Sequence, residues 1–430
     1  MKTRHALLRL MFLLVSGWVL AACSFGSSGS SGSSASISCS SPSTGLTAPT
    51  GINVMPLTVS NCSTSYENEP LVSVKICQHG STTNCQTISN ILVDTGSYGL
   101  RVFSSVISSS VLNGLSSVSA GAGSLAECAV FGLGASLWGP VAKGDVVLGD
   151  LSGTETASNV AIQLINASYG SVPGNCDGSY TTPASAGYSG ILGVGLWSND
   201  CPSCVTLTSP NQYFSCSGST CTSTTVVATN QVTNPVVELP TDNQGVQLVF
   251  PSVSASAGSP PLKGYMLLGI DSRTTTGGYY NNSSSGYTLY AASSQAPDFQ
   301  ATYNGSHYTS FIDSGSNALF FPNNSGIAEC AIDSYEYLCP SSLTVITPTL
   351  TGCTGAELSP ACTGSATTPS LSIYNALTLL ESGNAVFSSL AVPSSGSQFD
   401  VGFPFFLGKT VLVGITGQSS SLGTGPYWGF

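Results

Sequence analysis

The chain has 430 residues, enough for two domains of common size. Its formal net charge is −11, with 9 Lys and Arg residues against 20 Asp and Glu residues. Binding to nucleic acid phosphates needs clustered positive charge, so this composition excludes nucleic acid as an expected partner.

The first 22 residues have the features of a lipoprotein signal peptide. Three basic residues (Lys2, Arg4 and Arg9) precede an apolar stretch over 10–20, and the segment LAAC then ends at Cys23. The apolar stretch is too short to span a membrane well, and LAAC resembles the bacterial lipoprotein cleavage box. We therefore expect a chain that is exported and held on a bacterial membrane by lipid on Cys23. A plain signal peptide or an anchor helix that happens to end in Cys is the alternative.

Residues 23–50 are expected to form a flexible tether from the lipidated Cys23. Ser, Gly, Thr and Ala dominate this segment, as in SFGSSGSSGSSASIS. Such a composition buries little apolar surface and stays flexible. No later segment is long and apolar enough to cross a membrane, so the lipid is the only membrane contact that the sequence predicts.

The cysteines indicate disulfides rather than free thiols. Fifteen Cys residues less Cys23 leave an even number in an exported chain. The motif CPSC at 201–204 has the spacing of a redox pair or half a zinc site, but it lacks a second CxxC and the chain has only 3 His. We expect structural disulfides and no metal or other cofactor. Four closely spaced candidate pairs are Cys77/Cys85, Cys216/Cys221, Cys330/Cys339 and Cys353/Cys362.

The rest of the chain is expected to be all-β. Short β-rich runs such as LVSVKIC, GVQLVF and TVLVGI alternate with Gly, Ser and Asn turns, and long amphipathic helical repeats are absent.

Two motifs recur in the folded part. ILVDTGS contains Asp94 and FIDSGS contains Asp313, and in each an apolar strand leads into Asp, then Thr or Ser, Gly and Ser. A Leu-Gly pair follows each motif, with 99 residues from Asp94 to Gly193 and 95 from Asp313 to Gly408. Two motifs at nearly equal spacing predict a duplicated lobe. We expect an N-terminal lobe over 51–240 and a C-terminal lobe over 241–430, with the Leu-Gly pairs beneath the Asp loops (Leu192, Gly193, Leu407 and Gly408).

The doubled motif suggests a carboxyl pair that activates water. Two facing carboxyl groups cannot both be comfortably ionised, so they share a proton. One then acts as a general base on water, and the other donates a proton to a substrate carbonyl oxygen. Gly96 and Gly315 are expected to donate backbone N–H bonds to a carboxylate. Thr95 and Ser314 are expected to lock the two loops together. Ser97 and Ser316 are expected to hold the outer carboxyl oxygens.

These motifs resemble those of the bilobal, pepsin-like aspartic proteases, in order, over most of residues 51–430. LVSVKICQHGSTTNCQTISNILVDTGS is similar to the hairpin that leads into the first catalytic loop, and GYMLLGIDSRTTTGG to the entry into the second lobe. More narrowly, the chain resembles a group of bacterial lipoproteins described only as a domain of unknown function.

The resemblance implies two pseudo-symmetric β lobes with a central cleft, and catalytic roles for Asp94 and Asp313. It implies hydrolysis of peptide bonds in a peptide or unfolded protein bound as an extended strand, without cofactor. We expect a monomer.

The sequence departs from that family at two related positions. The segment AVFGLGASLWG is the expected flap, and it puts Phe131, beside Gly132, where the family has Tyr. Arg101 replaces the Trp found seven residues after the first Asp. Arg101 either adds positive charge near the pair, which would favour ionised carboxylates, or points to solvent. Trp138 is a candidate to replace the missing aromatic ring.

Other functions are less consistent with the sequence. Asp-Thr-Gly and Asp-Ser-Gly are good turn formers, but turn chemistry does not predict the repeated Leu-Gly partner. A serine hydrolase would need a base, yet the chain lacks a Gly-x-Ser-x-Gly motif and offers only His79 and His307 after the signal. The main alternative is the same fold without catalysis, binding a peptide or protein in its cleft.

Overall fold

The computed structural model describes residues 37, 39–62, 66–132, 135–177, 180–293, 298–332, 335–353, 362–394 and 396–430. They belong to one compact unit, Ala35–Phe430. The expected signal peptide and Cys23 lie outside the described residues.

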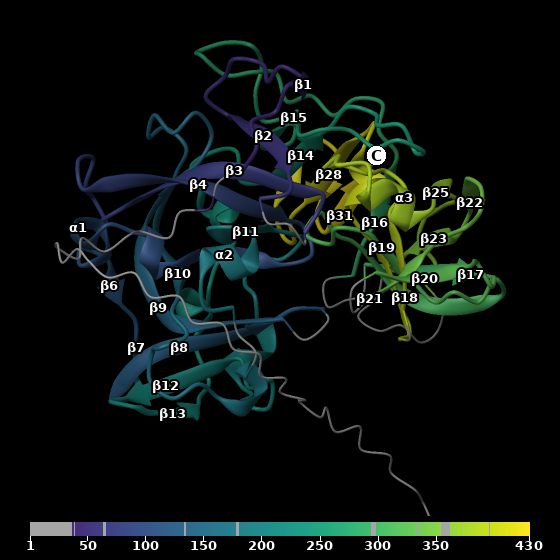
Figure 1. The fold of residues 1–430 in the computed structure, drawn as a ribbon. Helices are drawn as coiled ribbons and strands as arrows, with labels where there is room; N and C mark the ends of the chain where they lie inside the picture. Colours follow the sequence, from purple (N-terminus) through teal and green to yellow (C-terminus); the bar gives the residue numbers. More distant parts are fainter. Residues whose placement is uncertain are drawn as a thin grey trace, which may run out of the picture. The chain divides into compact units, whose positions relative to one another are not determined.

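The all-β prediction is confirmed, because strands make up most of the regular structure (Figure 1). In the described part of the chain, no helix is long and apolar enough to cross a membrane. The α-helices are α1 (Ser109–Leu112), α2 (Pro183–Ala186) and α3 (Ala376–Leu380). The 3-10 helices are η1 (Ser104–Val106), η3 (Gly174–Cys176), η4 (Pro202–Val205), η5 (Ala228–Asn230), η6 (Pro235–Glu238) and η7 (Phe403–Phe406).

Six strands of the N-terminal half close into a ring. Going round the ring, β3 pairs with β4, β4 with β11, β11 with β5, β5 with β10, β10 with β9, and β9 with β3 again. A closed ring leaves no free sheet edge, and its inward side chains fill a core. The strands are β3 (Glu69–Cys77), β4 (Cys85–Asp94), β5 (Tyr98–Phe103), β9 (Ser136–Val147), β10 (Thr156–Ile165) and β11 (Gly190–Val194).

A hairpin extends from this ring. Strand β8 pairs with β9 on one side and with β12 on the other. The strands of this extension are β6 (Ser116–Ser117), β7 (Ser119–Ala120), β8 (Gly123–Val130), β12 (Tyr213–Ser217) and β13 (Thr220–Ser223).

A second set of strands continues the same sheet and draws on both ends of the chain. Strand β2 pairs with β3 of the ring and also with β15, which leads on through β14 and β28 to β31 and β16. The strands are β1 (Thr44–Gly45), β2 (Val54–Ser60), β14 (Gly245–Val249), β15 (Leu262–Leu268), β16 (Leu289–Ala291), β28 (Thr410–Gly414) and β31 (Tyr427–Gly429).

Seven strands between Phe299 and Val401, within the C-terminal half, form a separate sheet in the order β24-β23-β17-β18-β27-β19-β26. Strand β17 alternates buried Phe299, Ala301 and Tyr303 with more exposed Gln300 and Thr302, so one face of this strand packs on a core. The strands are β17 (Phe299–Tyr303), β18 (Ser306–Ile312), β19 (Leu319–Phe321), β23 (Thr349–Gly352), β24 (Ala366–Thr367), β26 (Ala391–Pro393) and β27 (Gln398–Val401).

Three two-stranded sheets complete the described strands. They are β20 (Glu329–Ile332) with β21 (Tyr335–Leu338), β22 (Thr344–Ile346) with β25 (Leu371–Ile373), and β29 (Ser419–Ser420) with β30 (Gly423–Thr424).

One local topology occurs in both halves. In the first, β11 runs parallel to β4 and antiparallel to β5, so it lies between the strands before and after the Asp94 loop. In the second, β27 runs parallel to β18 and antiparallel to β19, around the Asp313 loop. Each Asp loop is therefore supported from below by a strand from much later in the sequence.

The predicted end of the tether at residue 50 is wrong. Cys39 forms a disulfide with Cys62, Thr44–Gly45 pairs with β15, and the Leu46 N–H donates to the Lys263 carbonyl. The Ser-rich composition does not reveal these contacts, because they depend on residues far along the chain. Any flexible tether therefore ends before Cys39.

The disulfide prediction is confirmed for the described cysteines. All four closely spaced candidate pairs form, and Cys201 of the CPSC motif pairs with Cys204. The sequence did not give the pairing of Cys39 with Cys62 or of Cys128 with Cys176.

Candidate active site

The two motif carboxyl groups face each other across their loops. Asp94 ends β4, and Asp313 directly follows β18. A Cβ atom added to Gly96 would lie 2.6 Å from Cγ of Asp313. In the same way, a Cβ added to Gly315 would lie 2.7 Å from Cγ of Asp94. Only glycine leaves room for a carboxyl group of the opposite loop to come this close.

Reciprocal hydrogen bonds lock the two loops together. The Thr95 hydroxyl donates to the Ile312 carbonyl (3.0 Å) and accepts from the Ser314 N–H (2.9 Å). The Ser314 hydroxyl does the same in the other direction, donating to the Val93 carbonyl (2.7 Å) and accepting from the Thr95 N–H (3.1 Å). Thr95 and Ser314 are both buried, so these four bonds are shielded from water and fix the spacing of the loops.

Within its own loop each carboxyl accepts two hydrogen bonds. Asp94 accepts from the Gly96 N–H at Oδ1 (2.8 Å) and from the Ser97 hydroxyl at Oδ2 (2.5 Å). Asp313 accepts from the Gly315 N–H at Oδ1 (2.7 Å) and from the Ser316 hydroxyl at Oδ2 (2.7 Å). The four donors orient both carboxyl groups and favour negative charge on them.

Burial and mutual repulsion oppose that negative charge. Asp94 is only 5% exposed, and burial raises its pKa well above the usual range. The nearby charge of Asp313 raises it further, while Ser97 and Gly96 lower it. Burial therefore favours the protonated form of Asp94. Two facing carboxyl groups that share one proton have the form needed to act as both acid and base.

The residues beneath the loops match the sequence expectation in one half only. Leu192 and Gly193 lie on β11, and Gly193 is opposite Asp94 in the parallel register. Leu407 and Gly408 are not beneath the second loop, so that expectation is wrong: Gly408 follows η7 and donates its N–H to the Pro251 carbonyl.

Strand β27 takes the place expected for Leu407 and Gly408. Val401 pairs with Ile312 and accepts the Asp313 N–H (3.0 Å). Gly402 follows, where a Cβ would lie 2.0 Å from the Ala318 carbonyl oxygen. Gly402 is thus the counterpart of Gly193.

The expected flap residues lie at the turn between β8 and β9. The Phe131 N–H donates to the Ala135 carbonyl (2.8 Å), and Gly132 is exposed. Phe131 packs against the buried cluster that contains Phe103 and Tyr188. Trp138 is fully buried, packs edge-on against Phe214 and donates its Nε1–H to the Tyr169 carbonyl (2.7 Å). It therefore belongs to a different cluster from Phe131 and does not replace the missing ring.

Arg101 does not point to solvent, because it is only 2% exposed. Its Nη2 lies 2.6 Å from Glu127 Oε1 and 2.8 Å from Asp200 Oδ2, and its Nη1 donates to the Tyr98 carbonyl. Burial opposes charge on Arg101, Glu127 and Asp200 alike. Arg101 and neighbouring hydrogen bonds nevertheless lower the pKa of Glu127. Burial and the charge of Glu127 raise the pKa of Asp200. The guanidinium of Arg101 is thus directed at Glu127 and Asp200.

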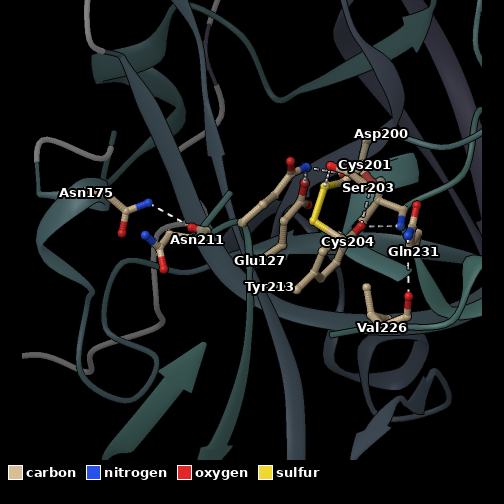
Figure 2. Close-up of a disulfide and its surroundings, with 12 residues drawn as sticks. Glu127, Asn175, Asp200, Cys201, Ser203, Cys204, Asn211, Tyr213, Val226 and Gln231 are labelled. Atoms are coloured by element: carbon tan, nitrogen blue, oxygen red, sulfur yellow. Dashed lines mark hydrogen bonds between the residues drawn. A yellow bond between two sulfur atoms is a disulfide. The ribbon is translucent and has the colours of Figure 1, made fainter. Parts of the chain in front are cut away.

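Figure 2 shows Glu127, Asp200 and Tyr213 beside the Cys201–Cys204 disulfide. The Tyr213 hydroxyl donates to Asp200 Oδ1 (2.6 Å). Arg101 and these neighbours anchor β5, the strand that follows the first Asp loop. Arg101 lies on β5 and donates to the carbonyl of Tyr98, the first residue of that strand.

Three further residues near the pair were not found from the sequence. The Tyr66 hydroxyl donates to the Gly315 carbonyl. Asp400 Oδ2 accepts a hydrogen bond from the Ser316 hydroxyl (2.6 Å). Asp298 is buried, and burial together with the nearby charge of Asp313 raises its pKa. None of the three belongs to a repeated motif. For Asp298 and Asp400, the one signal in the sequence was an Asp next to apolar residues in a chain with few carboxylates.

No group of three or more His, Cys, Asp and Glu side chains is arranged to hold a metal ion in the ranges that the structure describes.

A family model described as "Protein of unknown function (DUF3443)" matches residues 49–430. The chain belongs to this family. A comparison with curated proteins finds no match. The matched DUF3443 region contains both Asp loops and the strands beneath them.

We predict that Arg101→Met destabilises this DUF3443 protein by about 3–5 kcal/mol, because it leaves Glu127 and Asp200 buried without a cation. Thermal unfolding would show a midpoint lower by roughly 10 °C. Adding Glu127→Gln and Asp200→Asn should restore most of the loss. Lys263→Met, on an exposed side chain, is the matched control and should change stability by less than about 0.5 kcal/mol. Equal effects of the two single substitutions would contradict this role of Arg101.

We also predict that stability falls as pH rises from acid to neutral. Burial raises the pKa of Glu69 to about 9 and that of Asp298 to about 7. The stability these groups contribute is complete below their unfolded pKa near 4 and is lost as pH rises through the folded values. The unfolding midpoint should be about 5 °C or more higher at pH 5 than at pH 8.

The variant Asp298→Asn tests the cause of this slope. It removes one titrating group, so the fall in midpoint between pH 5 and 7 should become shallower. An unchanged slope in this variant would show that Asp298 does not hold its proton in the folded protein.

Proposed function

We propose that this protein is an aspartic endopeptidase that hydrolyses peptide bonds with a water activated between Asp94 and Asp313. The observation that carries the proposal is the facing arrangement of the two carboxyl groups, each opposite the glycine of the other loop. The reciprocal Thr95 and Ser314 bonds support it, because they serve no purpose for two independent turns. In this proposal the two halves are lobes of a pepsin-like fold, with the substrate cleft between them.

The reaction follows from the shared proton. A water held between the carboxyl groups loses a proton to the ionised carboxylate as its oxygen attacks the peptide carbonyl carbon. The protonated carboxyl gives its proton to the carbonyl oxygen, which forms a neutral tetrahedral intermediate. That intermediate then loses the proton from one hydroxyl, the C–N bond breaks, and the amide nitrogen takes up a proton. The products are a carboxylic acid and an amine, and the pair returns to its starting state.

The proposed substrate is a peptide or an unfolded stretch of protein bound as an extended strand. Main-chain hydrogen bonds would supply most of the affinity, and side-chain pockets the preference. With the lipoprotein-type signal and Cys23, we propose that the enzyme acts outside the cytoplasm, anchored to the membrane by its N-terminal lipid.

A second candidate function is binding of a peptide or protein without chemistry. Two observations favour it. Phe131 lacks the hydroxyl of the flap Tyr found in the pepsin-like proteases. The Tyr66 hydroxyl already donates a hydrogen bond to the Gly315 carbonyl beside the pair. A main-chain N–H of a bound strand would compete for that same carbonyl.

We predict that the chain starting at Ala35, which retains Cys39, cleaves a denatured protein between about pH 3 and 7, where a coupled carboxyl pair titrates. Asp94→Asn and Asp313→Asn should each lower the cleavage rate by about 10³-fold or more, since each removes one acid–base partner. Mass spectrometry of the fragments would measure the rate and the cleavage sites.

Asp177→Asn makes the same chemical change on an exposed aspartate and should leave the rate unchanged. Cleavage that survives both active-site substitutions would point to a contaminating protease. Absence of cleavage by folded, disulfide-bonded protein that still binds the denatured substrate would support the second candidate.

A further inference from the structure

A third carboxyl group stands behind the candidate pair. Asp400 lies on β27, the strand beneath the second Asp loop, and is 8% exposed. Its Oδ2 is 2.6 Å from the Ser316 hydroxyl, and the same hydroxyl is 2.7 Å from Oδ2 of Asp313. Ser316 therefore sits between two carboxyl oxygens.

Counting protons shows that one of these carboxyl groups is neutral. Each of the two short contacts needs one hydrogen, but a serine hydroxyl supplies only one. The second hydrogen must come from a protonated oxygen of Asp313 or Asp400. Two ionised carboxylates would leave one oxygen–oxygen contact without a hydrogen, which is repulsive.

The remaining hydrogen bonds decide which group holds the proton. Asp313 also accepts the Gly315 N–H at its other oxygen, so both its oxygens face donors. Oδ1 of Asp400 is buried and has no hydrogen-bond partner within the described residues. Charge is favoured where donors surround it and disfavoured where an oxygen is buried without a partner. The neutral group is therefore Asp400.

We propose that Asp400 is a positioning residue which, as a neutral acid, donates a hydrogen bond to Ser316 and thereby makes Asp313 the ionised member of the pair. Ser316 then points its own hydrogen at Asp313, and hydrogen bonds in such a chain strengthen one another. Asp94 would keep the shared proton. The catalytic consequence, that Asp313 takes the proton from water, rests on the proposed function; the charge state of Asp400 does not.

The two halves differ at this position in a way that fits the proposal. In the parallel register, Asp400 pairs with Phe311, two residues before Asp313. The corresponding pair in the first half is Ile191 with Leu92. The first half thus carries the apolar Ile191 where the second half carries the carboxyl group of Asp400. Of the two support strands, only the one beneath the Asp313 loop has a carboxyl group at this position.

The charges around Asp400 also favour its neutral form. Burial raises its pKa well above the usual range, and the charges of Asp313 and then Asp94 raise it further, while the Ser316 hydrogen bond lowers it. These carboxyls face it from the two Asp loops. A second negative charge beside Asp313 would be repelled, whereas a neutral donor is attracted.

The first test measures the charge state without relying on activity. The full chain, in detergent and labelled with ¹³C at the aspartate carboxyl carbons, is titrated by NMR from pH 4 to 7. Among the resonances that keep the shift of a protonated carboxyl at pH 6, which should include those of Asp94 and Asp298, one should vanish in Asp400→Asn. An Asp400 resonance that titrates near pH 4, as an exposed Asp does, would overturn the proposal whether or not the protein is a protease.

The second test uses the pH dependence of cleavage, because the acid limb of the kcat/KM profile reports ionisation of the pair. Asp400→Val removes the donor, so the acid limb should move up by about 0.5–1 pH unit and kcat should fall about 10-fold with little change in KM. Asp400→Asn retains a donor N–H and should leave the limb in place. If Asp400 were ionised, both substitutions would remove a negative charge and move the limb down.

Ser316→Ala provides the coupling control. It cuts the connection between Asp400 and Asp313, so adding Asp400→Val should produce no further shift of the acid limb. Additive shifts in the double variant would mean that Asp400 acts on the pair by another route and would overturn the proposal. Unfolding midpoints of all variants identify any that fail to fold.

Discussion

The close approach of two carboxyl groups is the constraint on which the rest of this structure depends. Bringing Asp94 and Asp313 together in a buried place costs free energy, through desolvation and mutual repulsion. The arrangement persists because each group has two local donors, because a glycine opposite each one leaves space, and because buried cross-bonds from Thr95 and Ser314 prevent the loops from moving apart. Strands β11 and β27 hold both loops from beneath, one in each half.

Charge is arranged differently at the pair and next to it. Around the pair, burial raises the pKa of Asp94 and of the neighbouring Asp298 and Asp400, which favours their protonated forms. At Arg101, by contrast, a buried cation is balanced by Glu127 and Asp200 and is used to hold Tyr98 in place. Arg101 therefore strengthens the strand after the loop, and its ion-pair partners are Glu127 and Asp200.

The all-β class and the two Asp loops could be predicted from sequence, because the loop motif is local and occurs twice. The support position of Leu192 and Gly193 could also be predicted from sequence, because an apolar strand that ends in Gly is a local signal. The second support strand was misplaced, because Leu407-Gly408 has nearly the same spacing as the first pair, while the true counterpart, Val401-Gly402, has a shorter one. Tyr66, Asp400 and the partners of Arg101 could not be found, because their roles depend on contacts with residues distant in the chain.

The cross-bonds join residues more than 200 positions apart, and this separation affects when the site can form. Proteins are made and exported from the N-terminus, and contacts between distant segments form late. A chain that has emerged only as far as β16 contains Asp94 and a complete six-stranded ring, but nothing faces that carboxyl. The second loop is not fully supported until β27 has emerged, close to the C-terminus. Biosynthesis therefore delays assembly of the pair until the chain is almost complete, so that a nascent or C-terminally shortened chain carries Asp94 without a facing carboxyl group.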